Sequence, residues 1–233
     1  ELRAVYEAIK GQSYDPGNFR RRFMRMQTDG IIEQAPDTFR AKFVTSAGDF
    51  TVTCNRDWAP HGVDRFYNLV KIGFFQDVSF FRAIKNFVVQ FGIHGDPAVS
   101  KVWKDENLPV DPPKESNTKG MLTYAMAGSP DTRSTQLFVN LTDNKSLDAQ
   151  KFSPICKVDD NDMPAVLKIY TGHGSEAGGD QANIQNKGNK YLREKYPKLD
   201  YIENVTIVGD DEPDGCGGGD GAAADDTAAA PDD

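Results

Sequence analysis

The side chains that most often carry out chemistry in enzymes are few in this 233-residue sequence and form no recognisable set. The three histidines lie far apart in the chain, at His61, His94 and His173. The three cysteines match no spacing typical of zinc sites, at Cys54, Cys156 and Cys216. No Ser/His/Asp arrangement or catalytic carboxylate pair can be recognised either. We therefore predict no metal and no cofactor.

A more informative pattern combines aromatic residues with an arginine and a glutamine in residues 80–92. Phe-Phe-Arg at residues 80–82 precedes Phe-Val-Val-Gln-Phe-Gly at residues 87–92. Three further blocks follow in order, in residues 120–128, 134–139 and 147–158. Together the four blocks resemble the signature of the cyclophilin-type peptidyl-prolyl cis-trans isomerases. Residues 90–97, 188–192 and 196–202 resemble the longer, bacterial-like branch of that family.

The resemblance implies an enzyme that accelerates rotation about X-Pro imide bonds. The barrier is roughly 18–20 kcal/mol, because conjugation of the nitrogen lone pair with the carbonyl is lost in the twisted state. No proton has to move, so neither a nucleophile, an acid–base pair nor a metal is needed. The reaction needs an apolar pocket for the proline ring and a hydrogen-bond donor to the prolyl nitrogen.

The resemblance places these roles on individual residues of this sequence. It implies that Arg82 is the donor to the prolyl nitrogen and that Gln90, the second catalytic residue, holds Arg82 and the substrate backbone in position. The substrate-binding residues that it implies are Phe87, Val88, Ala125, Met126, Ala127, Gln136, Phe138, Leu147 and Phe152. The backbone of residues 125–126 would pair with the peptide as an added strand would. The expected partners are proline-containing peptides and unfolded client proteins, whose folding the enzyme would assist.

The sequence departs from the best-known eukaryotic members at three pocket positions. Ser146 stands where those members often carry a Trp that helps to bind cyclosporin, so weak or no cyclosporin binding is expected. Val88 replaces the usual Met, which shortens one wall of the pocket. Phe152 replaces a His that is common near the rim. Reduced turnover is compatible with these changes, whereas the implied donor and glutamines are retained.

The fold that the resemblance implies is mainly β, a closed eight-stranded antiparallel β-barrel capped by two helices. The residue pattern agrees with it. Alternating apolar residues on both sides of a turn at residues 47–49 predict a β-hairpin, and apolar residues at positions 63, 66, 69 and 70 predict an amphipathic helix. Further short strands are predicted in residues 78–84, 87–91, 121–125, 137–141, 152–158 and 205–208, and a second helix in residues 163–170.

Three parts of the chain differ in composition. Residues 1–39 are predicted to be a partly helical N-terminal extension, and residues 40–208 to be the cyclophilin-like isomerase domain. Residues 209–233 consist largely of Gly, Ala and Asp with no aromatic residue, so they cannot bury enough apolar surface to offset ordering. We predict a disordered acidic tail.

The net charge of −8 resides almost entirely in this tail. Nine acidic residues and no Lys or Arg follow Gly209, which leaves the rest of the chain near neutral. Nucleic acid is bound by clustered Lys and Arg residues that contact its phosphates, and a near-neutral domain provides no such excess of positive charge. No nucleic-acid partner is therefore predicted. No apolar run approaches the roughly 18 residues of a membrane span. We expect a soluble monomer.

The compartment is left open by the sequence. An odd and sparse cysteine count suits a reducing compartment or a protein that does not depend on bridges, although one disulfide pair remains compatible with it. The chain has neither a start Met nor an apolar leader, so we expect a cytoplasmic protein or a processed form from another compartment.

Two alternatives to an isomerase are a noncatalytic peptide-binding scaffold and a sugar-binding protein. A noncatalytic peptide-binding scaffold on the same fold would keep the pocket but lose turnover, and fold alone cannot separate it from an enzyme. A sugar-binding β-sandwich would need surface aromatics in a row. Trp58 and Trp103 are isolated, which argues against the sugar-binding class.

Overall fold

The structure, a computed structural model, describes residues 33–209 of the chain. Within these residues the β-strands are β1 (Thr38–Thr45), β2 (Phe50–Asn55), β3 (Val78–Ser79), β4 (Arg82–Ala83), β5 (Val88–Phe91), β6 (Met121–Tyr124), β7 (Leu137–Asn140), β8 (Pro154–Val158) and β9 (Tyr201–Val208). The α-helices are α3 (Pro60–Lys71), α4 (Pro97–Trp103), α5 (Ser146–Ala149), α6 (Met163–Val166) and α7 (Gln181–Lys195). Three 3-10 turns are η1 (Pro130–Thr132), η2 (Asp160–Asp162) and η3 (Ala177–Asp180).

Two of the predicted parts fall largely outside this range. The N-terminal extension lies outside the described residues up to residue 32, and the acidic tail lies outside them from residue 210. Of the described helices, none is long and apolar enough to cross a membrane.

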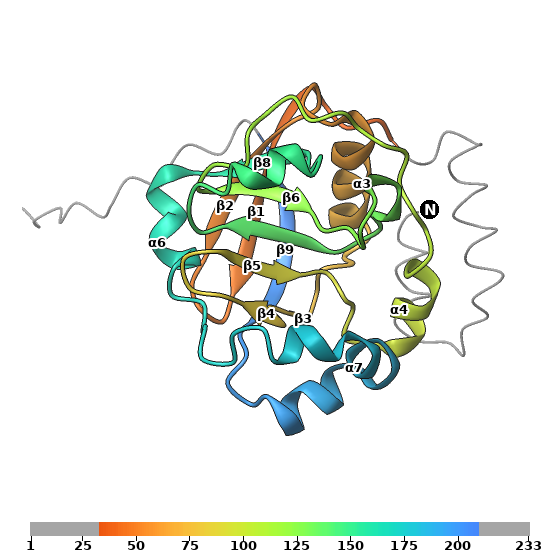
Figure 1. The fold of residues 1–233 in the computed structure, drawn as a ribbon, viewed down its shortest axis with the longest axis vertical. Coiled ribbons are helices and arrows are strands. Elements are labelled where there is room, and N and C mark those ends of the chain that lie inside the picture. The colour runs from red at the N-terminus through yellow and green to blue at the C-terminus, as the bar shows by residue number, and fades with distance from the viewer. Residues whose placement is uncertain (1–32, 210–233) are drawn as a thin grey trace, which may run out of the picture.

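The nine strands form one curled antiparallel sheet in the order β3-β9-β1-β2-β8-β6-β7-β5-β4 (Figure 1). The predicted closed eight-stranded barrel capped by two helices is therefore wrong in its detail, although the mainly-β class is right. The reason lies in residues 78–84, which were expected to form one strand. The backbone leaves strand geometry at Phe80 and Phe81, so β3 pairs with β9 and β4 pairs with β5 at opposite ends of the sheet.

The main core fills the inside of the curled sheet. Every second residue of β1 and β2 is buried, as the alternation in the sequence predicts. The rings of Phe43 and Phe50 stack across this hairpin with centroids 4.6 Å apart. Helix α3 covers the core with Val63, Phe66, Leu69 and Val70, the four positions that define its predicted apolar face. Burial of each such side chain stabilises the folded state by about 1.5–3 kcal/mol relative to leaving it exposed to water.

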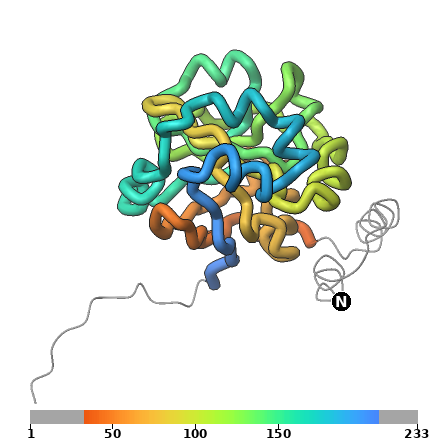
Figure 2. Tube along the Cα trace, turned by 90° about the horizontal axis from the view of Figure 1, so that it is seen from below, coloured from red at the N-terminus to blue at the C-terminus, as the bar shows by residue number. Residues whose placement is uncertain are grey.

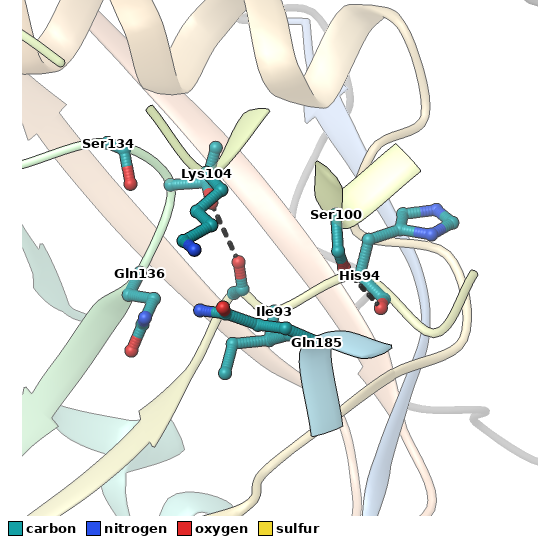
Figure 3. Close-up of a pocket in the computed structure, with 9 residues that line it drawn as sticks. Ile93, His94, Ser100, Lys104, Ser134, Gln136 and Gln185 are labelled. Carbon is teal, nitrogen blue, oxygen red and sulfur yellow. Dashed lines mark hydrogen bonds between the residues drawn. The ribbon is translucent and has the colours of Figure 1, made fainter. Parts of the chain in front are cut away.

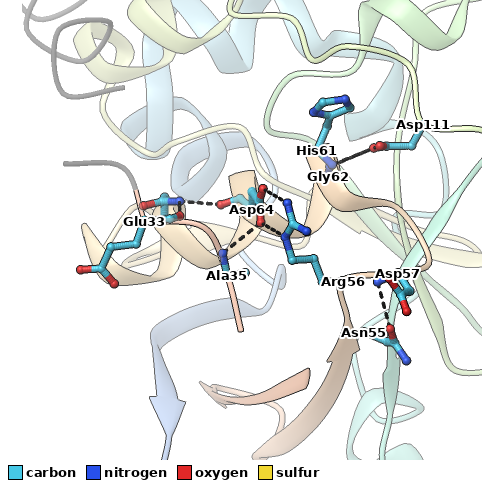
Figure 4. Close-up of polar contacts among 10 residues, drawn as sticks. Glu33, Ala35, Asn55, Arg56, Asp57, His61, Gly62, Asp64 and Asp111 are labelled. Atoms are coloured by element: carbon cyan, nitrogen blue, oxygen red, sulfur yellow. Dashed lines mark hydrogen bonds and ion pairs between the residues drawn. The ribbon is translucent and has the colours of Figure 1, made fainter. Parts of the chain in front are cut away.

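The N-terminus of α3 is held by a buried carboxylate (Figure 4). Asp111 accepts hydrogen bonds from the backbone N–H groups of His61 at 3.1 Å and Gly62 at 2.9 Å. The guanidinium of Arg133 lies 3.3 Å from the same carboxylate, and both side chains are 1% exposed. The loop that contains Asp111 is thereby fixed between the helix and the residues that lead into β7.

A disulfide joins β2 to β8. Cys54 and Cys156 are directly opposite each other in the antiparallel register, with Cα atoms 3.9 Å apart, and both are fully buried. The cysteine count was compatible with one disulfide but did not indicate its partners. The register of β2 and β8 brings Cys54 and Cys156 together as the pair.

The segment of η3 and α7 forms a second layer beside β3 and β4 (Figure 1). Figure 2 views the molecule from this side, where the teal-to-blue part of the chain runs across its face. The backbone at Gly188 has a φ of 62° and passes so close to Gly95 that a Cβ there would lie 2.1 Å from the Gly95 carbonyl oxygen. The N–H of Asn189 donates to that same carbonyl at 2.9 Å. This contact docks α7 on the loop that follows β5.

Candidate active site

The candidate catalytic residues share one face of the sheet because of its register. Arg82 of β4 is directly opposite Gln90 of β5, and Gln90 is opposite Phe138 of β7. Residues in directly opposed positions project from the same side of a sheet. The intervening residues Val89 and Phe91 point the other way, into the main core.

A directed pair of hydrogen bonds links the polar side chains on this face. Arg82 Nη1 donates to Gln90 Oε1 at 3.0 Å, and Gln90 Nε2 donates to Gln136 Oε1 at 2.9 Å. The Arg82 guanidinium lies over the ring of Phe87, 5.7 Å from its centroid. Burial lowers the pKa of Arg82, yet an arginine guanidinium keeps its charge in proteins. The site therefore presents a fixed cation beside an aromatic ring.

An apolar patch lies next to this cation, separate from the main core. Its members are the buried Val88, Phe138 and Leu147, with the half-buried Phe87, Ala125 and Phe152 packed against them. The rings of Phe138 and Phe152 meet edge to face with centroids 5.6 Å apart. The structure thus brings together six of the nine residues that the sequence assigned to substrate binding, and Gln136 joins them through Gln90.

The remaining two, Met126 and Ala127, follow β6 in a more exposed loop. The N–H of Ala127 donates to Thr132 Oγ1 at 2.7 Å. The N–H of Ala125 donates to the Gln136 carbonyl at 2.9 Å, within the protein itself. A peptide paired with residues 125–126 as an added strand would therefore have to use their other backbone groups.

A cavity of about 30 Å³ lies beside Gln136, large enough for a water molecule (Figure 3). Gln185 of α7 and Lys104, which follows α4, extend toward it from two other elements. The imidazole of His94 points away from the cavity, and burial lowers its pKa.

Two residues near the site were missed by the sequence analysis. Gln136 Nε2 donates to Gln181 Oε1 of α7 at 3.0 Å. Gly178 of η3 lies against the aliphatic part of Arg82, where a Cβ would come within 2.6 Å of Arg82 Cδ. Neither contact has a local sequence signal, because both depend on how the second layer docks on β4 and on the residues before β7.

At Gly92 the backbone that follows β5 passes close to the backbone that precedes β7, next to Gln136. Gly92 has a φ of 104°, and a Cβ there would lie 2.2 Å from the Thr135 carbonyl oxygen. We expect Gly92→Ala to lower the free energy of unfolding by more than about 2 kcal/mol, because backbone strain of about 1–3 kcal/mol adds to a clash. Chemical denaturation measures this change.

Gly128→Ala is the matched control, because Gly128 also has a positive φ of 85° but no atom within 4 Å of the added Cβ. This variant carries the strain without the clash, so its loss should be the smaller of the two. If the two variants lost the same free energy of unfolding, the close backbone approach at Gly92 would make no contribution to the cost of its substitution.

The chain matches a known protein family and is similar in sequence to several of its members. The family model described as cyclophilin type peptidyl-prolyl cis-trans isomerase/CLD matches residues 40–187. A peptidyl-prolyl cis-trans isomerase of Arabidopsis thaliana is 30% identical over 121 residues, which are 48% of this chain and 71% of the relative. Peptidyl-prolyl cis-trans isomerase-like 2 of Aspergillus oryzae is 32% identical over 105 residues, or 42% of this chain, and the match spans only 18% of that longer relative.

Solved structures show the same fold. A cyclophilin type peptidyl-prolyl cis-trans isomerase of Cryptosporidium parvum superposes with a TM-score of 0.52 at 18% identity, covering 74% of this chain and 99% of that one. The structure of that protein in the presence of the dipeptide Ala-Pro gives a TM-score of 0.50 at the same identity, with 73% and 99% covered. At this identity the likeness concerns the fold.

Proposed function

Because the chain belongs to the cyclophilin-type peptidyl-prolyl cis-trans isomerase family, we propose that it catalyses rotation about X-Pro imide bonds in peptides and unfolded proteins. The observation that carries the proposal is the Arg82 guanidinium, held by Gln90 beside the apolar patch. A hydrogen-bond donor fixed next to an apolar surface is what this mechanism requires for the twisted imide.

The proposed mechanism stabilises the twisted state more than either planar state. As the bond rotates, the prolyl nitrogen regains its lone pair and becomes an acceptor, and Arg82 donates a hydrogen bond to it. A hydrogen bond to a charged group is worth about 1.5–3 kcal/mol net, or about one to two decades of rate. This falls short of a full enzymatic acceleration, so the surroundings of the imide must contribute the rest.

The apolar patch is proposed to supply that contribution. The twisted imide is less charge-separated than the planar one, so an environment poor in water favours it. Val88, Phe138 and Leu147 would hold the proline ring while the preceding carbonyl turns. Gln136 and the backbone of residues 125–127 would bind the peptide on either side, and Gln90 would keep Arg82 aimed at the nitrogen.

Exchange spectroscopy on a short Ala-Pro peptide tests the proposal. Catalytic amounts of the chain are expected to increase the rate at which the cis and trans NMR signals exchange. Binding of the peptide without faster exchange would identify the noncatalytic scaffold instead. The choice of peptide is supported by the Cryptosporidium parvum relative, whose structure was solved in the presence of the dipeptide Ala-Pro.

Weak cyclosporin binding is a further part of the proposal. Ser146 is exposed at the first residue of α5, directly before Leu147 of the apolar patch. We expect Ser146→Trp to tighten cyclosporin binding on the order of tenfold, because a packed Trp commonly contributes more than about 1 kcal/mol to an interface. Calorimetric titration measures the affinity, and Ser146→Ala should leave it unchanged. A Trp variant that binds no more tightly than the original chain would contradict this prediction.

A further inference from the structure

The layer of η3 and α7 is firmly packed next to the candidate site. It has its own small core of buried residues, made of Phe81, Ile93, Ala177, Ile184, Leu192, Tyr196 and Leu199. Phe81 directly precedes Arg82, and Ile93 directly follows Gly92. The side chains that anchor this layer therefore flank the two strands that carry the candidate catalytic pair.

The same layer touches the candidate donor itself. The backbone of Gly178 lies against the aliphatic part of Arg82 and leaves no room for a side chain. On the next residue, the N–H of Ala83 donates to the Gly174 carbonyl at 3.2 Å. One side of Arg82 is thus bounded by η3, while the other faces Gln90 and Phe87.

A chain of hydrogen bonds continues from Arg82 into α7, and its direction is fixed by chemistry. A guanidinium can only donate, so Gln90 must present its oxygen to Arg82 and its NH₂ group to Gln136. Gln136 must in turn present its oxygen to Gln90, which leaves its NH₂ group for the oxygen of Gln181 at 3.0 Å. Gln181 presents its oxygen as the acceptor at the end of this chain, which matches the orientation of the Gln136 amide that Arg82 and Gln90 impose.

We propose that Gln181 is a positioning residue for the isomerase reaction, acting through Gln136. The inference rests on the proposed function and extends the site to Gln181, the first residue of α7, which lies outside the segments that carry the family resemblance. The Gln136 NH₂ group has two hydrogens, so with one held by Gln181 the other is left to donate to the peptide. The amide of Gln136 then binds the substrate backbone without first having to reorient.

Three substitutions at Gln181 separate this role from a merely structural one. Gln181→Ala removes the acceptor, and kcat/KM is expected to fall about two- to tenfold. Gln181→Glu keeps an acceptor at the start of a helix, where a negative charge is tolerated, and should stay within about twofold of the original value. Gln181→Lys offers only a donor and would turn the Gln136 amide away from Gln90, so its loss should exceed that of the Ala variant.

The side-chain amide signals of Gln136 give a readout that does not depend on activity. In ¹H–¹⁵N NMR spectra of the full chain they are expected to shift in Gln181→Ala and to stay near their original position in Gln181→Glu. Asn186→Ala is the matched control, because Asn186 is an exposed amide on the same helix. It should change neither the Gln136 signals nor kcat/KM.

A double substitution completes the test. If Gln181 acts through Gln136, then Gln181→Ala should cause no further loss of kcat/KM in a Gln136→Ala background. Two results would overturn the positioning role. One is that the Gln136 signals do not change in Gln181→Ala. The other is that Gln181→Ala lowers kcat/KM as much in the Gln136→Ala background as in the original chain. If the original chain fails to accelerate exchange, the proposed function fails, whereas the Gln136 signals still decide whether Gln181 sets that amide.

Discussion

Arg82→Ala is expected to lower kcat/KM for an Ala-Pro peptide by about 10- to 150-fold, measured by exchange spectroscopy. The loss corresponds to the roughly 1.5–3 kcal/mol of a charge-assisted hydrogen bond that forms only as the imide twists. Peptide affinity should fall much less, because the apolar patch and Gln136 remain in place. A variant that binds as before but turns over slowly would show that the guanidinium acts in the transition state.

Two controls make this result specific to the site. Arg40→Ala removes an arginine from β1 of the same sheet, where it donates to Asp159 at 2.8 Å, and should leave kcat/KM unchanged. Arg82→Lys keeps the charge but loses the planar fork that reaches Gln90, so its activity should lie between those of the original chain and the Ala variant. Full activity in Arg82→Ala would refute the proposed mechanism.

Two elements that depend on local sequence, the first hairpin and the first helix, were predicted correctly. The hairpin of β1 and β2 follows from alternation of apolar and polar residues over residues 38–55, and α3 from the spacing of Val63, Phe66, Leu69 and Val70. Each pattern predicts the buried face of its strand or helix from neighbouring residues alone, without knowledge of long-range contacts. The predicted second helix in residues 163–170 was too long, since α6 ends at Val166.

Features that depend on distant parts of the chain could not be obtained in this way. Residues 78–84 read as one strand, yet the chain turns at Phe80 and Phe81, whose rings enter two different cores. Helix α7 was missed because few apolar residues mark it and because its docking relies on the backbone contact of Gly188 with Gly95. A contact between two glycines leaves no periodic signal.

In the candidate site, too, some residues could be predicted from the sequence, whereas one depends on a contact between distant parts of the chain. The family resemblance identified Arg82, Gln90 and Gln136. The register of β4 and β5 pairs Arg82 with Gln90, and Gln136, directly before β7, joins them through its hydrogen bond with Gln90. Gln181 lies 45 positions from Gln136 and meets it only through the second layer. The family resemblance could therefore identify Arg82, Gln90 and Gln136 but not the residue that α7 adds.

The largest stability effect is expected at Asp111, whose carboxylate joins α3 to the chain before β7. Asp111→Ala would leave the buried guanidinium of Arg133 without its counter-charge and the N–H groups of His61 and Gly62 without their acceptor. Breaking a buried ion pair from one side costs about 3–5 kcal/mol, since the remaining charge stays out of water. Chemical denaturation with the disulfide intact should show a loss of this size in the free energy of unfolding.

Asp49→Ala is the matched control for this variant. Asp49 pairs with Lys42 at 3.3 Å, but the two side chains are 47% and 49% exposed, so water screens the pair. Its removal should cost no more than about 1 kcal/mol. Arg133 directly precedes residues 134–136, so the Asp111 variant should also loosen the backbone that carries Gln136 and reduce kcat/KM under conditions where it remains folded. If Asp111→Ala were no less stable than Asp49→Ala, the buried pair would not be what holds this end of α3 to the site.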